Sequence, residues 1–172
     1  VAVGAGVYQI NLVIDTVIAS LLPAGSISYL FYADRVNQLP LGVLGVAVGT
    51  ALLPLLSRQV RAGETAAALN SQNRALEISL LLTLPAAAAL MVISEPVIRV
   101  LFERGQFGPV ETAATAAALS VYALGLPAYV MVKALAPGFF AREDTATPVK
   151  ISVACLVLNL VLNLILMGPF KH

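Results

Sequence analysis

The stretch from Thr112 to Val132, TAATAAALSVYALGLPAYVMV, decides the class of fold to which this chain belongs. It carries no charged side chain, and it is long enough to cross a bilayer as a helix, which takes about 20 apolar residues. A second uncharged stretch runs from Ile151 to Phe170, and a slightly shorter one runs from Ile78 to Ile93. These stretches predict a polytopic α-helical membrane protein.

The composition of the whole chain indicates the same class. Of its 172 residues, 59% are hydrophobic and only 11% are charged, and the mean hydropathy is +0.92. Soluble domains carry about 25% charged residues. The net charge of +1 is uninformative about nucleic acid, but the sequence has no basic tract, so no nucleic-acid partner is expected. A single cysteine, Cys155, excludes a disulfide framework within the sequence.

The hydropathy pattern predicts an all-α fold with about five transmembrane helices and one short helix at the membrane interface. The spans are expected at about residues 1–22, 27–56, 75–94, 110–135 and 148–167. Between the third and fourth spans, the apolar residues Val97, Ile98, Leu101 and Phe102 share one face of a short interfacial helix. A polar loop is expected from Ser57 to Arg74. Residues 1–172 are therefore predicted to form a single transmembrane bundle.

The distribution of Lys and Arg predicts the orientation of these spans. Cytoplasmic loops of membrane proteins carry an excess of positive charge. The connections after the second and fourth spans hold six basic residues, and those after the first and third spans hold two, Arg99 and Arg104. The six are Arg58, Arg61, Arg74, Lys133, Arg142 and Lys150. We therefore expect these connections in the cytoplasm and the turn at residues 23–26 outside.

The pair Asp34 and Arg35 lies within the second span, where charge is costly. An ionisable residue at the centre of a bilayer costs about 2.5–3.5 kcal/mol on insertion scales, and such residues face a bundle interior or a wet cavity. Either the two neutralise each other or nearby helices, or Arg35 binds an anion. Adjacent helical residues diverge by about 100°, and a guanidinium matches phosphate oxygens bidentately. Arg35 is therefore a candidate contact for an anionic ligand, with Asp34 beside it.

The rest of the second span contains residues that bend or closely pack helices. Proline removes a backbone donor and kinks a helix, and the spacing Gly45-Val-Ala-Val-Gly49 allows two helices to approach closely. These residues predict a packing seam, and interrupted helices of this kind are also typical of transporters. The candidate hinge and packing residues are Pro40, Gly42, Gly45, Gly49 and Pro54.

A second polar set is a candidate cation site. Asp15 lies in the middle of the first span, and Asn159 and Asn163 share one face of the fifth span. Carboxylate and amide oxygens are ligands for hard cations such as Na⁺. The alternative is that the amides form hydrogen bonds between helices and that Asp15 is protonated.

Residue constellations for catalysis are not found in the sequence. The single histidine is His172, and no Walker loop, nucleophile elbow or His/Glu metal spacing occurs. We therefore expect a protein that is not an enzyme and that needs no organic cofactor.

Several motifs resemble those of the MurJ (MviN) lipid II flippase family, within the multidrug/oligosaccharidyl-lipid/polysaccharide exporter superfamily. The most specific stretch is Tyr32-Ala-Asp-Arg35 followed by Gln38-Leu-Pro-Leu-Gly-Val-Leu-Gly45. The resemblance continues in Gly49-Thr-Ala-Leu-Leu-Pro54, Leu56-Ser-Arg58, Gln9-Ile-Asn-Leu, Arg104-Gly-Gln-Phe107 and Gly168-Pro-Phe-Lys-His172. It covers essentially the whole chain, which looks like helices seven to eleven of about fourteen, most of one lobe of a two-lobe fold.

The resemblance implies a function for these residues. The family moves the undecaprenyl-diphosphate-linked peptidoglycan precursor across the bacterial inner membrane by alternating access, and Arg35 would contact the diphosphate. Some members are linked to Na⁺ through positions like those of Asp15, Asn159 and Asn163, although some carry a carboxylate where this chain has Asn163. The expected partners are the lipid-linked precursor, membrane lipid and the remainder of the transporter chain.

Three alternatives remain open. The chain could belong to another exporter of the superfamily that moves drugs or polysaccharide lipids. It could be a membrane enzyme acting on polyprenyl phosphates, for which Glu143 and Asp144 alone offer acidic residues at the cytoplasmic surface. It could also be a purely structural fragment, a role that leaves Arg35 unexplained.

Overall fold

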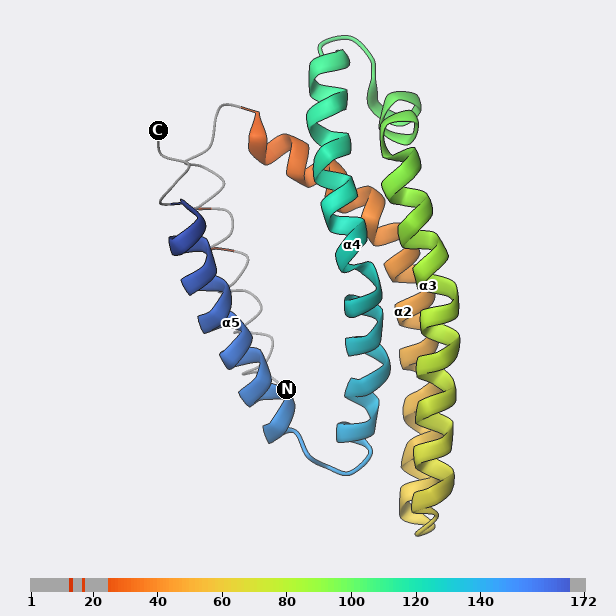
Figure 1. Cartoon of the computed structure of the whole chain (residues 1–172). Helices are drawn as coiled ribbons and strands as arrows, with labels where there is room; N and C mark the ends of the chain where they lie inside the picture. The colour runs from red at the N-terminus through yellow and green to blue at the C-terminus, as the bar shows by residue number, and fades with distance from the viewer. Residues whose placement is uncertain (1–12, 14–16, 18–24, 168–172) are drawn as a thin grey trace. The chain divides into compact units, whose positions relative to one another are not determined.

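The structure is a computed structural model that describes Val13, Val17 and residues 25–167 (Figure 1). Four long helices follow one another in this part of the chain: α2 (Ser26–Arg61), α3 (Thr65–Phe102), α4 (Pro109–Phe140) and α5 (Ala146–Met167). Each of them is long and apolar enough to cross a bilayer. Almost all of the predicted first span lies outside the described residues. The described part is that of an all-α, multi-pass membrane protein.

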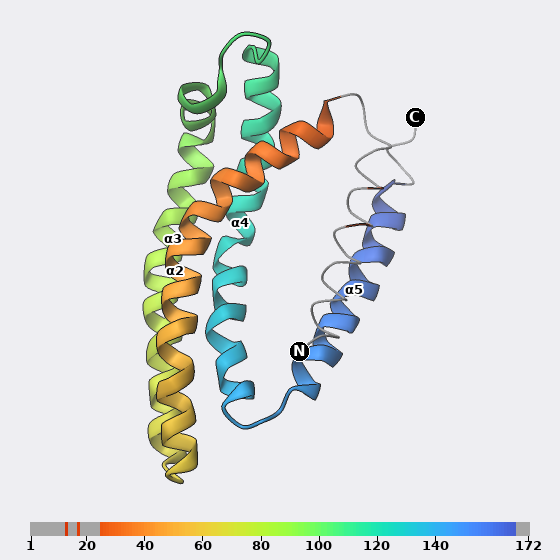
Figure 2. The same ribbon diagram turned by 180° about the vertical axis from the view of Figure 1, so that it is seen from behind.

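Residues 28–142 form one compact unit, which contains α3, α4 and nearly all of α2. The first half of α2 crosses α4, and its second half runs beside α3 (Figure 2). The crossing is held by Ala33 and Val36 of α2, which pack with Ile98 of α3 and Leu119 of α4. Residues from three helices therefore meet at the start of α2, where the Asp34–Arg35 pair lies.

The second half of α2 packs on α3 through another cluster. Leu52 and Leu56 lie against Ala68, and the side-chain amide of Gln59 donates a hydrogen bond to Ser71 Oγ at 3.0 Å. This cluster extends the contact between the two helices as far as their joining turn.

The interior of the unit is made mostly of small and hydroxyl-bearing side chains, and many large apolar side chains face outward. Ser94 of α3 and Ser120 of α4 share a hydrogen bond between their hydroxyls at 2.9 Å. Val92 is 82% exposed and Leu81 is 71% exposed. Lipid tails are as apolar as leucine, so membrane helices gain more from close packing of small residues than from burying large ones. The buried small residues are Ala33, Ala68, Ser79, Thr83, Ala87, Ser94, Thr112, Thr115, Ala116, Ala123 and Ala134.

The predicted polar loop from Ser57 to Arg74 is wrong. Helix α2 continues to Arg61 and α3 begins at Thr65, so only a tight turn joins them. Gly63 adopts a φ of +75° in this turn, a conformation that glycine accepts without strain. The segment after the turn is rich in alanine and other strong helix formers. Polar composition therefore marked the end of the apolar span but not the end of the helix.

The short helix predicted after the third span is present, and a kink at Ile93 sets it off from the rest of α3. Helix α3 runs on to Phe102 and is interrupted only at Ile93, where φ is −105° and ψ is 16°. Pro96 lies three residues farther on; it has no N–H to donate and disfavours a helical conformation in the residue before it. The helix bends at this point and then continues.

Helix α5 belongs to a second unit of the chain. Its start is capped by Asp144, whose carboxylate accepts a hydrogen bond from the backbone N–H of Thr147 at 3.0 Å. Hydrogen bonds from the Thr147 side chain and backbone lower the pKa of the Asp144 carboxyl. This residue therefore has a local capping role.

Candidate functional site

Arg35 lies on a face of α2 that is not buried against the helices of its unit. Its neighbours Ala33, Val36 and Asn37 are 0%, 4% and 4% exposed, whereas Arg35 itself is exposed. Successive helical residues are rotated by about 100°, so the buried face and Arg35 point in different directions. Within the described residues, Arg35 makes no ion pair with a carboxylate.

The guanidinium of Arg35 is placed by an aromatic ring one turn earlier on the same helix. Its central carbon lies over the ring of Phe31, 4.8 Å from the ring centroid. A cation over an aromatic face is attracted by the ring quadrupole, by about 0.5–1 kcal/mol at exposed sites. The ring restricts the long arginine side chain but leaves its N–H donors available for an anion.

Asp34 has a different partner from Arg35. Its carboxylate accepts a hydrogen bond from the side-chain amide of Gln38, one turn later on α2. The geometry therefore separates the two adjacent charges, as the divergence of neighbouring helical positions predicts. Asp34 orients Gln38 in this structure and makes no ion pair to Arg35 within the described residues.

Tyr32 anchors this part of α2 to the connection between α3 and α4. Its ring centroid lies 4.8 Å from that of Phe102 and 5.5 Å from that of Phe107, where the two rings meet edge to face. Such pairs are worth about 0.5–1.5 kcal/mol each beyond the area they bury. The motif Tyr32-Ala-Asp-Arg35 thus combines one anchoring residue, one buried small residue and two charged side chains.

A buried amide lies directly after the motif. Asn37 is 4% exposed, and its side-chain oxygen is fully buried without a hydrogen-bond donor among the described residues. A buried acceptor without a partner costs about 1–3 kcal/mol. Three residues later, Pro40 lacks the N–H that would bond to the carbonyl of Val36.

The glycines of α2 differ in what surrounds them. A Cβ placed on Gly45 would lie 3.3 Å from Cγ of Lys133 in α4, and one on Gly49 would lie 3.8 Å from the Lys133 carbonyl oxygen. A Cβ on Gly42 would meet no neighbouring atom within 4 Å. The spacing Gly45–Gly49 is therefore a seam where α2 approaches α4, while Gly42 lies outside it. Both Pro40 and Pro54 lie inside α2.

The candidate cation site is only partly within the described residues. Asn159 and Asn163 share one face of α5, and the amide of Asn163 donates a hydrogen bond to Asn159 Oδ1 at 2.8 Å. Asp15 lies outside the described residues. In the part of the chain that the structure describes, no cluster of three or more His, Cys, Asp or Glu residues is placed to hold a metal ion.

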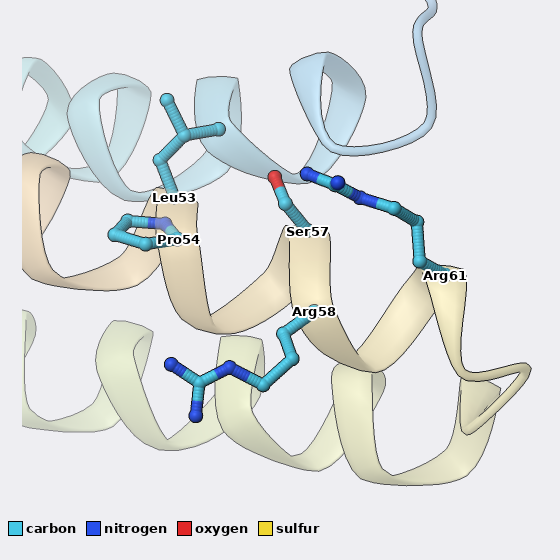
Figure 3. A pocket seen from close by; sticks show the side chains of 5 residues that line it. All are labelled: Leu53, Pro54, Ser57, Arg58 and Arg61. Carbon is cyan, nitrogen blue, oxygen red and sulfur yellow. The ribbon is translucent and has the colours of Figure 1, made fainter.

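A second cationic feature, not predicted from the sequence, lies at the far end of α2. A groove of about 490 Å³ is lined by Leu53, Pro54, Ser57, Arg58 and Arg61 (Figure 3). Its lining residues recur at intervals of three and four, which place Pro54, Ser57, Arg58 and Arg61 along one helical face. That spacing is visible in the sequence, as is the four-residue interval between Phe31 and Arg35.

The comparison with known families covers the entire chain. The family model described as "Lipid II flippase MurJ" matches residues 1–172. A probable lipid II flippase MurJ from Rhizobium meliloti is 54% identical over 165 residues, which are 96% of this chain and 31% of that protein. One from Rickettsia prowazekii is 42% identical over 170 residues, 99% of this chain and 33% of that protein. The chain spans about a third of the length of these curated relatives.

A solved structure shares the fold as well as the sequence. It is described as lipid II flippase MurJ in an inward closed conformation, and it superposes with a TM-score of 0.83 at 34% sequence identity. The match covers 92% of this chain and 33% of that chain. The resemblance found in the Tyr32–Arg35 motif is thereby confirmed, as is the all-α membrane fold. This chain belongs to the MurJ lipid II flippase family.

Proposed function

We propose that this chain forms part of a transporter that moves the lipid-linked peptidoglycan precursor across the bacterial inner membrane, and that Arg35 contacts the diphosphate of that lipid. The relatives are named lipid II flippases, but the chain spans only about a third of their length. The transport activity belongs to the longer protein, which supplies the rest of the cavity. The single observation that carries the role of Arg35 is an exposed guanidinium with no carboxylate partner in the described residues.

The energetics of the site support an anionic ligand. An arginine within a membrane span is stable only where it meets water, a counter-charge or a polar ligand. Stacking on Phe31 leaves the edge of the guanidinium available, and that edge can donate two parallel hydrogen bonds to phosphate oxygens. A diphosphate meets this requirement, and it binds by contact alone without covalent chemistry. Transport rather than catalysis is therefore the proposed activity.

The test uses the full-length protein with Arg35→Ala. We expect transport of the diphosphate lipid to be lost while the protein still inserts and folds, because the exposed side chain packs against no core residue. Arg104→Ala is the matched control: that arginine donates a 3.4 Å hydrogen bond to the carbonyl of Val100 on its own helix turn. Transport by Arg35→Ala at the rate of the control would refute the assigned role.

We also propose that Asp15, Asn159 and Asn163 together bind Na⁺. The shared face of the two asparagines on α5 and the chemistry of their amide oxygens support this proposal. The test is Na⁺ binding by the full-length protein, measured by calorimetry, with Asn159→Leu and Asn163→Leu. Unchanged Na⁺ affinity in both variants would show that the two amides act only as a hydrogen-bonded pair.

A further inference from the structure

The groove at the end of α2 has a chemistry that the proposed transport path does not use. Figure 3 shows Ser57 and Arg61 on the side of α2 toward the end of α4, and Arg58 on the side toward the start of α3. Pro54 and Ser57 precede both arginines along α2, and all four residues line the groove. The groove therefore has Arg58 on one side, and Arg61 together with the Ser57 hydroxyl on the other.

Both arginines are available for a ligand. Neither Arg58 nor Arg61 forms a hydrogen bond or an ion pair with a side chain in the described residues, although the arginines at two other positions do. Glu64 follows Arg61 by three residues and pairs with neither arginine. Basic residues in the last turn of a helix complement its dipole. That effect accounts for positive charge at this end of α2, but it does not account for a groove between the two side chains.

The opposite end of the groove is apolar. Leu53 is 37% exposed and lies next to Pro54 in the lining. Going along α2 from Leu53 to Arg61, the surface changes from apolar to hydroxyl-bearing to cationic within about 12 Å, at a rise of 1.5 Å per residue. This sequence of surfaces matches a molecule with an acyl chain, a polar linkage and a phosphate.

The charge bias of the connections predicts that this end of α2 faces the cytoplasm. The cytoplasmic leaflet carries anionic lipids, and basic residues at its surface attract them by about 1 kcal/mol each. We propose that the groove formed by Leu53, Pro54, Ser57, Arg58 and Arg61 binds the phosphate headgroup of an anionic phospholipid in the cytoplasmic leaflet. Its acyl chain lies along Leu53 and Pro54, and its phosphate lies in the groove with Arg58 on one side and Arg61 and the Ser57 hydroxyl on the other.

Such a site lies on the same helix as Arg35 but at its other end. A lipid bound there would hold the cytoplasmic end of α2, and it would be a ligand distinct from the transported one. The proposal concerns binding, so its test does not depend on transport of any substrate.

The experiment compares lipid binding by the full-length protein, delipidated in detergent, for phosphatidylglycerol and for phosphatidylcholine with the same chains. Native mass spectrometry resolves each bound lipid. The test variant is Arg58→Gln/Arg61→Gln. The control is Arg74→Gln/Lys150→Gln, which removes the same charge from the same predicted side of the membrane but outside the groove. Arg58→Lys/Arg61→Lys retains the charge and serves if the glutamine variant does not fold.

We expect phosphatidylglycerol affinity to fall about tenfold or more in the groove variant and less than about twofold in the control, because two close charge-assisted contacts are lost only in the former. The lysine variant is expected to lie between them, since lysine lacks the bidentate fork. Equal losses in groove and control variants would overturn the proposal, as would phosphatidylcholine binding as tight as phosphatidylglycerol. Displacement of the lipid by inorganic phosphate alone would also overturn it, because the ligand would then be a free anion.

Discussion

The guanidinium of Arg35 lies over the ring of Phe31, 4.8 Å from its centroid, on a face of α2 that the neighbouring helices leave uncovered. The spacing of four residues brings the two side chains together on one helix. The ring therefore acts as a positioning residue for the proposed diphosphate contact. It limits the directions of the arginine without using the donors that would bind an anion.

Replacing Phe31 is expected to weaken the function of Arg35 without removing it. In the full-length protein, Phe31→Leu should reduce lipid transport about two- to fivefold, which corresponds to the loss of about 0.5–1 kcal/mol of stacking energy. The measurement is the initial rate of transport in reconstituted vesicles across a series of lipid concentrations. Phe31→Tyr keeps the aromatic face and should retain the rate. Transport by Phe31→Leu as fast as that of the tyrosine variant would show that the stacking does not matter.

The seam between α2 and α4 predicts opposite effects at two glycines. Gly42→Ala is expected to stabilise the protein by up to about 1 kcal/mol, because alanine favours a helix and no atom within 4 Å would meet its Cβ. Gly45→Leu should destabilise it by about 1–3 kcal/mol, because Lys133 already lies 3.3 Å from the position of a Cβ. Thermal unfolding of the full-length variants in one detergent measures both. Equal stability of the two variants would show that α2 and α4 do not pack through Gly45.

The hydroxyl pair Ser94 and Ser120 predicts a modest coupling between α3 and α4. Hydrogen bonds between membrane helices average about 0.6 kcal/mol and reach about 1.7 kcal/mol in double-mutant cycles. We expect a coupling energy in this range for Ser94→Ala, Ser120→Ala and the double variant, because their hydroxyls lie 2.9 Å apart. Unfolding titrations of all three variants and the parent provide the cycle. Strict additivity of the single changes would indicate that the two hydroxyls do not interact.

The aromatic contacts of Tyr32 predict a larger loss of stability than that hydroxyl pair. Tyr32→Ala removes two ring pairs and should cost about 1–3 kcal/mol of stability. Tyr32→Phe keeps both rings and should be nearly neutral, so it is the matched control. Hydrogen exchange of the amides at Phe102 and Phe107 reports whether the connection between α3 and α4 has loosened. Unaltered exchange in Tyr32→Ala would rule out an anchoring role for this ring.

The class of the protein and the approximate position of each described span could be predicted from the sequence. Transfer of a segment from water into a bilayer depends mainly on the composition of that segment, and the runs after Thr112 and Ile151 are uncharged. The same dependence on composition identified Arg35 as a costly charge within an otherwise apolar span. The family resemblance of residues 32–45 added the anion with which it is proposed to interact.

The ends of the helices were not predictable in this way. Residues 65–74 mix alanine with polar side chains, and they begin α3, where Leu56 and Gln59 of α2 pack on them. Likewise, helical structure resumes after the kink at Ile93, where Ile98 packs against α2 and α4. In both segments, contacts with another helix add to local propensity, which hydropathy does not measure.

The sequence by itself determined that this protein is a helical membrane protein. It also showed that Arg35, a charged residue in the second span, needs a polar or charged partner. Only the tertiary structure decided which face of α2 is buried, which places Ala33 and Val36 inside and Arg35 outside. It also decided that Gly45 meets Lys133 and that Arg58 and Arg61 flank a groove. The physical reason is that burial in a bilayer is a property of a segment, whereas packing depends on the partner that each face of a helix meets.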